Sequence, residues 1–280
     1  MNAPAELRTL LKQPGLIRAP GVFDGLSAHL VRSAGFPVAY LTGAGVSVSG
    51  YGLPDIGLVT GSEMADRAAM IVQACELPVI ADADTGYGNA LNVARTVRAY
   101  ERAGVAAIQF EDQVFPKRCG HLAGKEVVSA KEFTSKLRAA LDTRQADTVI
   151  IARTDARAPA GIDEAIDRAN KYADEGADVI FVEAPESGEE IERVAAEVSA
   201  PLLFNVVPGG RSPVISETDL ERLGFRIAIY PAALLGAATA AMTSALAQLG
   251  GRDIGEVTDV VGIFGLVGLG EWLEFSERYR

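Results

Sequence analysis

Short apolar runs alternate with longer segments of mixed polarity along the whole chain of 280 residues. Runs that are bounded by Gly, Pro or Asp predict strands, at residues 19–23, 38–42, 78–83, 106–111, 148–153, 178–183, 201–206 and 226–230. The segments between them have the apolar spacing of helices, at residues 26–33, 62–74, 90–102, 131–143, 163–175, 189–198, 217–223 and 232–248. Ser62 and Ser216 are the expected caps of two of these helices.

A parallel sheet covered by helices is the α/β arrangement that this alternation favours, because the strands are apolar on both faces. Eight such units predict a closed (β/α)8 TIM barrel, with residues 1–280 as a single domain. A doubly wound open sheet is the alternative, but no GxGxxG follows the first strand and no GxxxxGK(S/T) occurs. Residues 250–280 form a predicted C-terminal helical extension, and its apolar stretch 260–269 needs cover from the barrel or another subunit.

Charge and cysteine content narrow the possible partners. The net charge of −11, without a run of basic residues, argues against a nucleic-acid-binding surface. Cys75 and Cys119 have neither CxxC nor zinc-site spacing, so we expect a reducing compartment, the cytoplasm. Cys75 follows an apolar helical run and is expected to be an inert core thiol.

Two segments bear on export and membranes. Residues 1–14 are polar and lack the hydrophobic core of a signal peptide. Residues 227–249 carry no charge and are long enough to cross a bilayer, but Pro231 and Gly236 interrupt them. A buried strand followed by an Ala-rich helix is the preferred interpretation, so no membrane partner is expected.

Carboxylates collect where the predicted strands end, which is the edge that carries the active site in a barrel. Asp82 and Asp84 follow the third strand, Glu111 ends the fourth, and Asp55 lies in the loop after the second. Converging carboxylates repel one another unless a cation or a proton lies between them. All-oxygen ligation suits Mg²⁺, or Mn²⁺, so these four residues are the predicted metal site. The alternative is a capped turn with solvated acids.

Anion-binding groups lie at the same edge. Residues 42–45 (TGAG) form a small-residue loop whose backbone N–H groups are free to hold an anion. The guanidinium of Arg153, after the fifth strand, matches a carboxylate in bidentate fashion. Arg153 can equally form a structural ion pair with Glu183 or Asp155, and the two roles are compatible.

A cysteine lies among basic residues in the segment 117–121 (KRCGH), which follows the fourth strand. Positive charge stabilises a thiolate, so Lys117, Arg118 and His121 are expected to lower the pKa of Cys119. Such a thiol would be suited to proton transfer or nucleophilic attack. The alternative is a solvated basic loop with an incidental cysteine.

Taken together, the strand-end segments resemble those of the isocitrate lyase and phosphoenolpyruvate mutase superfamily. The resemblance covers essentially the first 250 residues and rests on segments 40–44 (YLTGA), 82–88 (DADTGYG), 109–112 (QFED), 117–121 (KRCGH), 151–155 (IARTD) and 181–184 (FVEA). It implies a barrel that binds an α-keto or α-hydroxy acid through Mg²⁺, with a mobile loop carrying Cys119. It also implies a homo-oligomer, a tetramer built as a dimer of dimers, with a helix exchanged between subunits.

The resemblance also assigns roles to individual residues. Asp82 would be the direct metal ligand, with Asp55, Asp84 and Glu111 reached through metal-bound waters. The substrate would contact Thr42, Gly43, Ala44 and Arg153, with Glu183 and Asn205 lining the pocket and Tyr40 as a possible base. Cys119 would deliver the proton in catalysis, with Lys117, Arg118, His121 and Glu111 as further catalytic residues.

Members of this superfamily that cleave carbon–carbon bonds carry a cysteine in the loop, so the resemblance favours a lyase that breaks a 2-hydroxy acid by retro-aldol chemistry. Methylisocitrate lyases commonly have Arg after the loop histidine, whereas this chain has Leu122. Residues 206–213 (VVPGGRSP) look more like those of 2,3-dimethylmalate lyases. A 2-alkylmalate is therefore the preferred substrate. The alternatives are methylisocitrate cleavage, oxaloacetate hydrolysis, carboxyphosphonoenolpyruvate chemistry, or a barrel that binds metabolites without catalysis.

Overall fold

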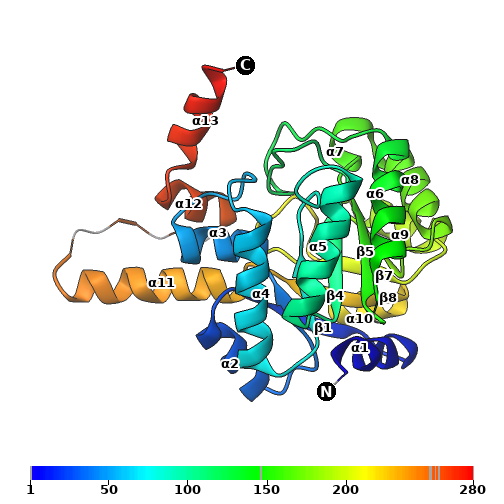
Figure 1. Ribbon diagram of the computed structural model, residues 1–280. Coiled ribbons are helices and arrows are strands. Elements are labelled where there is room, and N and C mark those ends of the chain that lie inside the picture. The colour runs from blue at the N-terminus through cyan, green and yellow to red at the C-terminus, as the bar shows by residue number, and fades with distance from the viewer. Residues whose placement is uncertain (1, 146, 252–253, 256, 258, 280) are drawn as a thin grey trace.

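Eight parallel strands close into a barrel in sequence order, as the alternating pattern predicts (Figure 1). The computed structural model describes residues 2–145, 147–251, 254–255, 257 and 259–279. The strands are β1 (Ile17–Val22), β2 (Ala39–Leu41), β3 (Val79–Asp82), β4 (Ala107–Glu111), β5 (Val149–Thr154), β6 (Val179–Val182), β7 (Leu202–Asn205) and β8 (Phe225–Tyr230). The TIM-barrel prediction is confirmed, and each strand lies within two residues of its predicted bounds.

Each helix that the pattern predicts is present within one residue of its expected bounds. These are α2 (Gly25–Ser33), α4 (Gly61–Cys75), α5 (Ala90–Ala103), α6 (Ala130–Thr143), α8 (Ile162–Asp174), α9 (Gly188–Glu197), α10 (Glu217–Arg222) and α11 (Ala233–Gln248). Ser216 caps α10 as expected, with its hydroxyl 3.0 Å from the backbone nitrogen of Asp219. The prediction for Ser62 was wrong, because Thr60 caps α4 in a reciprocal pairing with Glu63.

Three helices escape the pattern: α1 (Ala3–Lys12), α3 (Gly43–Tyr51) and the short α7 (Arg157–Ala160). Leu7 of α1 is fully buried among residues of the barrel interior, so this helix covers the amino-terminal ends of the strands. The expected small-residue loop at residues 42–45 was wrong. Thr42 is the N-cap of α3, and its hydroxyl lies 3.3 Å from the backbone nitrogen of Gly45, which favours a helix despite three glycines.

Two apolar layers hold the barrel together. The inward-facing side chains of the strands pack with Leu7 in one cluster, and the outward-facing ones pack against the surrounding helices in a second. Cys75 is fully buried in the second cluster, as expected, and burial raises the pKa of its thiol. Strand register brings Glu111 of β4 opposite Arg153 of β5, so the barrel itself places two site residues side by side.

The chain beyond β8 leaves the barrel. Helix α11 projects outward, and α12 (Val260–Leu266) and α13 (Leu269–Glu277) follow it (Figure 1). Ile263 and Phe264 of α12 are buried, so part of the apolar stretch 260–269 is covered within its own chain. The exchange of a helix between subunits stays a prediction. Among the described residues, none of the helices combines the length and the apolar character that a bilayer span requires.

Candidate active site

A cavity opens at the carboxyl ends of the strands and draws its walls from segments far apart in the sequence. Its volume is about 50 Å³, room for a few water-sized groups with the 117–125 loop folded over it. Most of the site residues predicted from the sequence line it: Tyr40, Thr42, Ala44, Asp55, Asp82, Lys117, Cys119, His121, Arg153, Glu183 and Asn205. Gly43, Asp84 and Glu111 are close to lining residues, namely Asp82, Lys117 and Arg153, whereas Arg118 does not line the cavity.

Buried acids meet the ammonium group of Lys117 at one side of the cavity. Its Nζ lies 3.0 Å from Oδ1 of Asp84 and also forms an ion pair with Asp55. Burial raises the pKa of Asp84 to about 7, and the carboxylates of Asp82 and Asp55 add to the shift. Burial also raises the pKa of Asp82. Although burial alone would lower the pKa of Lys117, the surrounding acids raise it well above its usual value. This cluster of acids therefore stabilises a positive charge, in this structure that of the Lys117 ammonium.

The buried acids on this side are suited to hold a divalent cation such as Mg²⁺. Oε1 of Glu111 is buried and has no hydrogen-bond partner among the described residues. At position 43 a Cβ atom would lie 2.8 Å from Oδ2 of Asp82, so glycine leaves that carboxylate accessible. Among the residues that the structure describes, no three His, Cys, Asp or Glu side chains converge closely enough to hold a metal together. Mg²⁺ normally keeps several of its waters, which suits this spacing.

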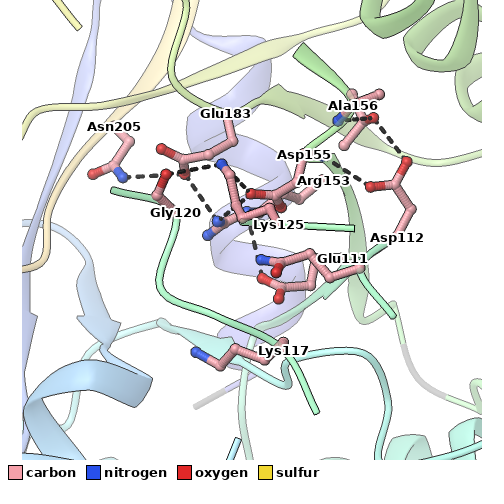
Figure 2. Close-up of polar contacts among 12 residues, drawn as sticks. Glu111, Asp112, Lys117, Gly120, Lys125, Arg153, Asp155, Ala156, Glu183 and Asn205 are labelled. Atoms are coloured by element: carbon pink, nitrogen blue, oxygen red, sulfur yellow. Dashed lines mark hydrogen bonds and ion pairs between the residues drawn. The ribbon is translucent and has the colours of Figure 1, made fainter. Parts of the chain in front are cut away.

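Arg153 lies at the centre of the second ionic cluster (Figure 2). Its Nε lies 2.8 Å from Oδ2 of Asp155 and 3.4 Å from Oε2 of Glu111, and its Nη2 lies 3.2 Å from Oε2 of Glu183. The guanidinium also stacks over the ring of Phe181, with 5.0 Å between Cζ and the ring centroid. The structural ion pairs expected from the sequence are therefore present, and the guanidinium still lines the cavity.

The pKa values of the carboxylates around Arg153 shift in opposite directions. Burial opposes the ionisation of Asp155, but Arg153 and Lys125 together lower its pKa. Burial raises the pKa of Glu111 well above its usual value despite the nearby guanidinium. Asn205 donates from Nδ2 to Oε2 of Glu183 over 3.3 Å, and in the part of the chain that the structure describes its Oδ1 has no hydrogen-bond partner. Unpaired polar atoms therefore remain on this wall to receive a ligand.

Two residues of this cluster, Asp112 and Lys125, escaped the sequence analysis as site residues. Asp112 accepts hydrogen bonds from the hydroxyls of Thr154 and Tyr172, from the guanidinium of Arg168 and from the backbone nitrogen of Asp155. Lys125 donates to Asp155 and to the carbonyl oxygen of Gly120, both over 2.8 Å. The segment 109–112 contains Asp112, but the sequence does not indicate the role of either residue, because their partners lie up to 60 residues away along the chain.

The pKa of the Cys119 thiol is raised and not lowered as predicted, so the thiol is protonated at neutral pH. The residue is only 7% exposed and packs against Phe264 and Leu269 of the C-terminal extension. Burial raises the pKa of the thiol to about 12, and the carboxylate of Asp55 reinforces the shift more than Lys117 opposes it. Proximity in the sequence suggested a cationic setting, but burial decides the protonation state.

The other basic residues of segment 117–121 do not surround the sulfur as positive charges. Lys117 is paired with acids, and burial lowers the pKa of His121, which favours its neutral form. The guanidinium of Arg118 donates to the carbonyl of Ala123 over 3.0 Å and turns away from the cavity. This geometry does not support a role for Arg118 in the cavity, and its catalytic role stays a prediction.

Tyr40 and the start of α3 form the part of the wall next to Asp82. Burial and the carboxylate of Asp82 raise the pKa of Tyr40 well above its usual value. Its phenol is therefore a hydrogen-bond donor at neutral pH, which does not suit the predicted role of base. Thr42 and Ala44 line the cavity at the amino-terminal end of α3. Backbone N–H groups at that end are suited to hold a carboxylate.

The comparisons with known proteins agree with this geometry. The family model for phosphoenolpyruvate phosphomutase matches residues 7–250, which include the whole barrel and every segment of the cavity except Val260. The 2,3-dimethylmalate lyase of Eubacterium barkeri is 50% identical over 254 residues, covering 90% of this chain and 88% of its own. The 2-methylisocitrate lyase of Halalkalibacterium halodurans is 47% identical over 234 residues, covering 84% and 77%.

Solved structures carry the likeness to the full length of the chain. Oxaloacetate acetylhydrolase in complex with 3,3-difluorooxalacetate has a TM-score of 0.87 and 41% identity, covering 99% of this chain and 97% of that one. Phosphonopyruvate hydrolase in complex with oxalate and Mg²⁺ has a TM-score of 0.78 and 32% identity, covering 100% and 99%. The chain belongs to the phosphoenolpyruvate mutase/isocitrate lyase superfamily and groups with the lyases in it.

Proposed function

We propose that this protein cleaves the carbon–carbon bond between C2 and C3 of a 2-alkylmalate-type acid in the presence of Mg²⁺. The products would be an α-keto acid such as pyruvate and a simple carboxylic acid. The observation that carries the proposal is the protonated thiol of Cys119, which is buried over the cavity among the acids and Arg153. Carbon–carbon cleavage of this kind produces a strongly basic carbanion, and a protonated thiol is a suitable acid to quench it.

The residues of the chain supply the steps of a retro-aldol reaction. The N–H groups at the start of α3 and the guanidinium of Arg153 bind the carboxylate and the oxygen on C2. A carboxylate of the acid cluster accepts the 2-hydroxyl proton, the C2–O bond becomes a carbonyl, and the C2–C3 electron pair moves to C3. Cys119 then donates its thiol proton to C3. With the loop folded over the cavity, water is excluded while the carbanion exists.

Magnesium fits the acid side of the cavity, and its assignment rests on the buried carboxylates and the superfamily. Asp82 would hold the ion directly, and Asp55, Asp84 and Glu111 would hold its waters. When bound, Mg²⁺ supplies Lewis-acid polarisation of the oxygen on C2. The structural relative in complex with oxalate and Mg²⁺ supports this assignment. Mn²⁺ prefers the same oxygen ligands and would substitute.

The third substituent of the substrate meets an apolar wall. Val207, Leu235 and Val260 line the cavity, and Leu122 packs in the apolar cluster around Cys119. The two charged basic groups of the cavity, Lys117 and Arg153, already contact two or more acids each. A tricarboxylate would leave its third carboxylate against aliphatic side chains, which is costly. An alkyl group fits this apolar wall, which favours a 2-alkylmalate. Methylisocitrate, which carries a third carboxylate, is therefore the second candidate.

Oxaloacetate hydrolysis is the competing reaction, because an oxaloacetate acetylhydrolase is among the structural relatives. A panel of 2-hydroxy di- and tricarboxylic acids with Mg²⁺, coupled to lactate dehydrogenase to detect pyruvate, separates the candidates. We expect turnover of 2,3-dimethylmalate or another 2-alkylmalate well above that of methylisocitrate. Conversion of oxaloacetate to oxalate and acetate, with no malate cleaved, would contradict the proposal.

For assembly and location, we propose a cytoplasmic homo-oligomer, a tetramer in which a helix is exchanged between subunits. The outer half of α11 exposes Met242, Leu246 and Leu249, the last to 84%. Exposed apolar surface of this kind needs a partner in water. Light scattering after size exclusion tests the tetramer, and a monomeric mass would contradict it.

A further inference from the structure

Lys125 is a lysine with no solvent exposure, at the end of the loop that carries Cys119. Its side chain and that of Asp155 are both 0% exposed, and their charged atoms lie 2.8 Å apart. The same ammonium donates to the carbonyl oxygen of Gly120 over 2.8 Å. Burial of a charged lysine is expensive and is tolerated only where the group is paired and hydrogen-bonded. Lys125 meets both conditions, because its ammonium is paired with Asp155 and hydrogen-bonded to Gly120.

The two partners of Lys125 belong to different parts of the site. Gly120 directly follows Cys119, so its carbonyl lies in the loop that folds over the cavity. Asp155 belongs to the barrel, and its Oδ1 also accepts from Nη2 of Arg153 over 3.0 Å. One carboxylate oxygen therefore holds both the loop ammonium and the guanidinium that lines the cavity (Figure 2).

The backbone at Gly120 lies very close to side chains of the barrel. A Cβ atom at this position would lie 2.6 Å from Nη2 of Arg153 and 2.6 Å from Cδ of Glu183. Behind Asp155, the carboxylate of Asp112 accepts from the backbone nitrogen of Asp155 over 2.8 Å. Asp155, the barrel partner of Lys125, is thus itself held in place by the buried carboxylate of Asp112.

We propose that Lys125 is a positioning residue that fastens the Cys119 loop to Asp155 and so sets the thiol against the groups held by Arg153. It touches neither the substrate nor the reacting atoms. Without the ammonium of Lys125, the carbonyl of Gly120 loses the hydrogen bond that connects the loop to the barrel. The loop then opens more often. The proposal rests on the proposed function for its kinetic consequence but not for its structural one.

The reactivity of Cys119 with a thiol reagent such as DTNB tests the fastening without any turnover. Cys75→Ala leaves Cys119 as the remaining thiol of the two that the chain contains. In that background the parent should react slowly, because Cys119 is 7% exposed. Lys125→Met should accelerate the reaction at least about tenfold, as expected for the loss of charge-assisted hydrogen bonds.

Lys136→Met is the matched control. Lys136 is another buried lysine, and its ammonium donates to the backbone carbonyl of Thr85 instead of to a residue of the 117–125 loop. It should leave the thiol reaction at the parental rate. An unchanged rate in Lys125→Met, or an equal acceleration in Lys136→Met, would overturn the proposal. If Lys125→Met fails to fold, as judged by circular dichroism, the milder Lys125→Gln replaces it with the same expected result.

Steady-state kinetics gives the second measurement. Because Arg153 remains to bind the substrate, Lys125→Met should lower kcat at least about tenfold, the scale of a misplaced catalytic group, with a much smaller change in KM. A rise in KM at unchanged kcat would contradict a positioning role. If the wild type cleaves no malate, the proposed function fails, and the thiol comparison still decides the role of Lys125.

Discussion

Replacement of Gly120 by alanine should disable catalysis by preventing the loop from closing fully. The position is buried at the point where the loop meets Arg153 and Glu183. Backbone strain plays no part, because the φ angle of Gly120 lies outside the left-handed region. The consequence of the substitution is therefore a matter of space alone.

The magnitude follows from the contact distances. The added Cβ atom would lie 2.6 Å from atoms of both Arg153 and Glu183, whereas ordinary van der Waals contact begins at 3.4 Å. The loop, or the two side chains, must therefore recede by about 0.8 Å, the difference between these distances. Arg153 and Glu183 are fixed by ion pairs, so the loop yields and carries Cys119 with it. A displacement near 1 Å lowers kcat by about 10²-fold.

The lactate dehydrogenase-coupled assay with Mg²⁺ and 2,3-dimethylmalate measures this effect. Gly188→Ala is the control, because no heavy atom lies within 4 Å of the Cβ it adds, and it should retain the wild-type kcat. Full kcat in Gly120→Ala would refute the reasoning. It would show that the loop does not approach Arg153 and Glu183 during turnover.

Three further predictions concern the thiol, the metal and the acids. Cys119→Ser should lower kcat by about 10² or more while calorimetric binding of substrate analogues and Mg²⁺ is preserved; full turnover would exclude the thiol as the acid. Asp82→Ala should weaken the Mg²⁺ dependence of activity, and an unchanged Mg²⁺ titration would contradict its assignment as ligand. Burial raises the pKa of Asp84 from 3.8 to about 7. The native state thus binds this proton more tightly than the unfolded state, and the cost of ionising Asp84 grows with pH through that range. In metal-free protein Asp84→Asn should stabilise more at pH 8 than at pH 5, by about 2 kcal/mol from thermal or urea unfolding. An equal gain at both pH values would argue against a buried, destabilising carboxylate.

The order of strands and helices was predictable because hydrophobic periodicity is local. The barrel was predictable for the same reason, since eight similar units in one chain leave few ways to cover a parallel sheet. Helix α3 was missed because its glycines disfavour a helix by propensity, whereas the cap at Thr42 and its packing against the barrel stabilise it. Local propensity is a weak guide where tertiary contacts intervene.

The identity of the site residues was easier to predict than their state. Strand ends brought Asp82 and Arg153 to one cavity, as their positions in the sequence suggested. The raised pKa of Cys119 could not be predicted, because it comes from burial to which Phe264 and Leu269 contribute, and these lie more than a hundred residues further along the chain. Lys125 was missed for the same reason, because its role depends on contact with Asp155, 30 residues further along the chain.

The most direct test of the central claim is the cleavage of 2,3-dimethylmalate by the wild-type enzyme with Mg²⁺ in D₂O, with the products identified by NMR. If a loop-borne thiol protonates C3 inside a closed cavity, pyruvate should appear together with propionate that carries one deuterium at C2 in a single configuration. Absence of cleavage, or propionate labelled without stereochemical preference, would contradict the claim, because a carbanion protonated by bulk solvent has no fixed face.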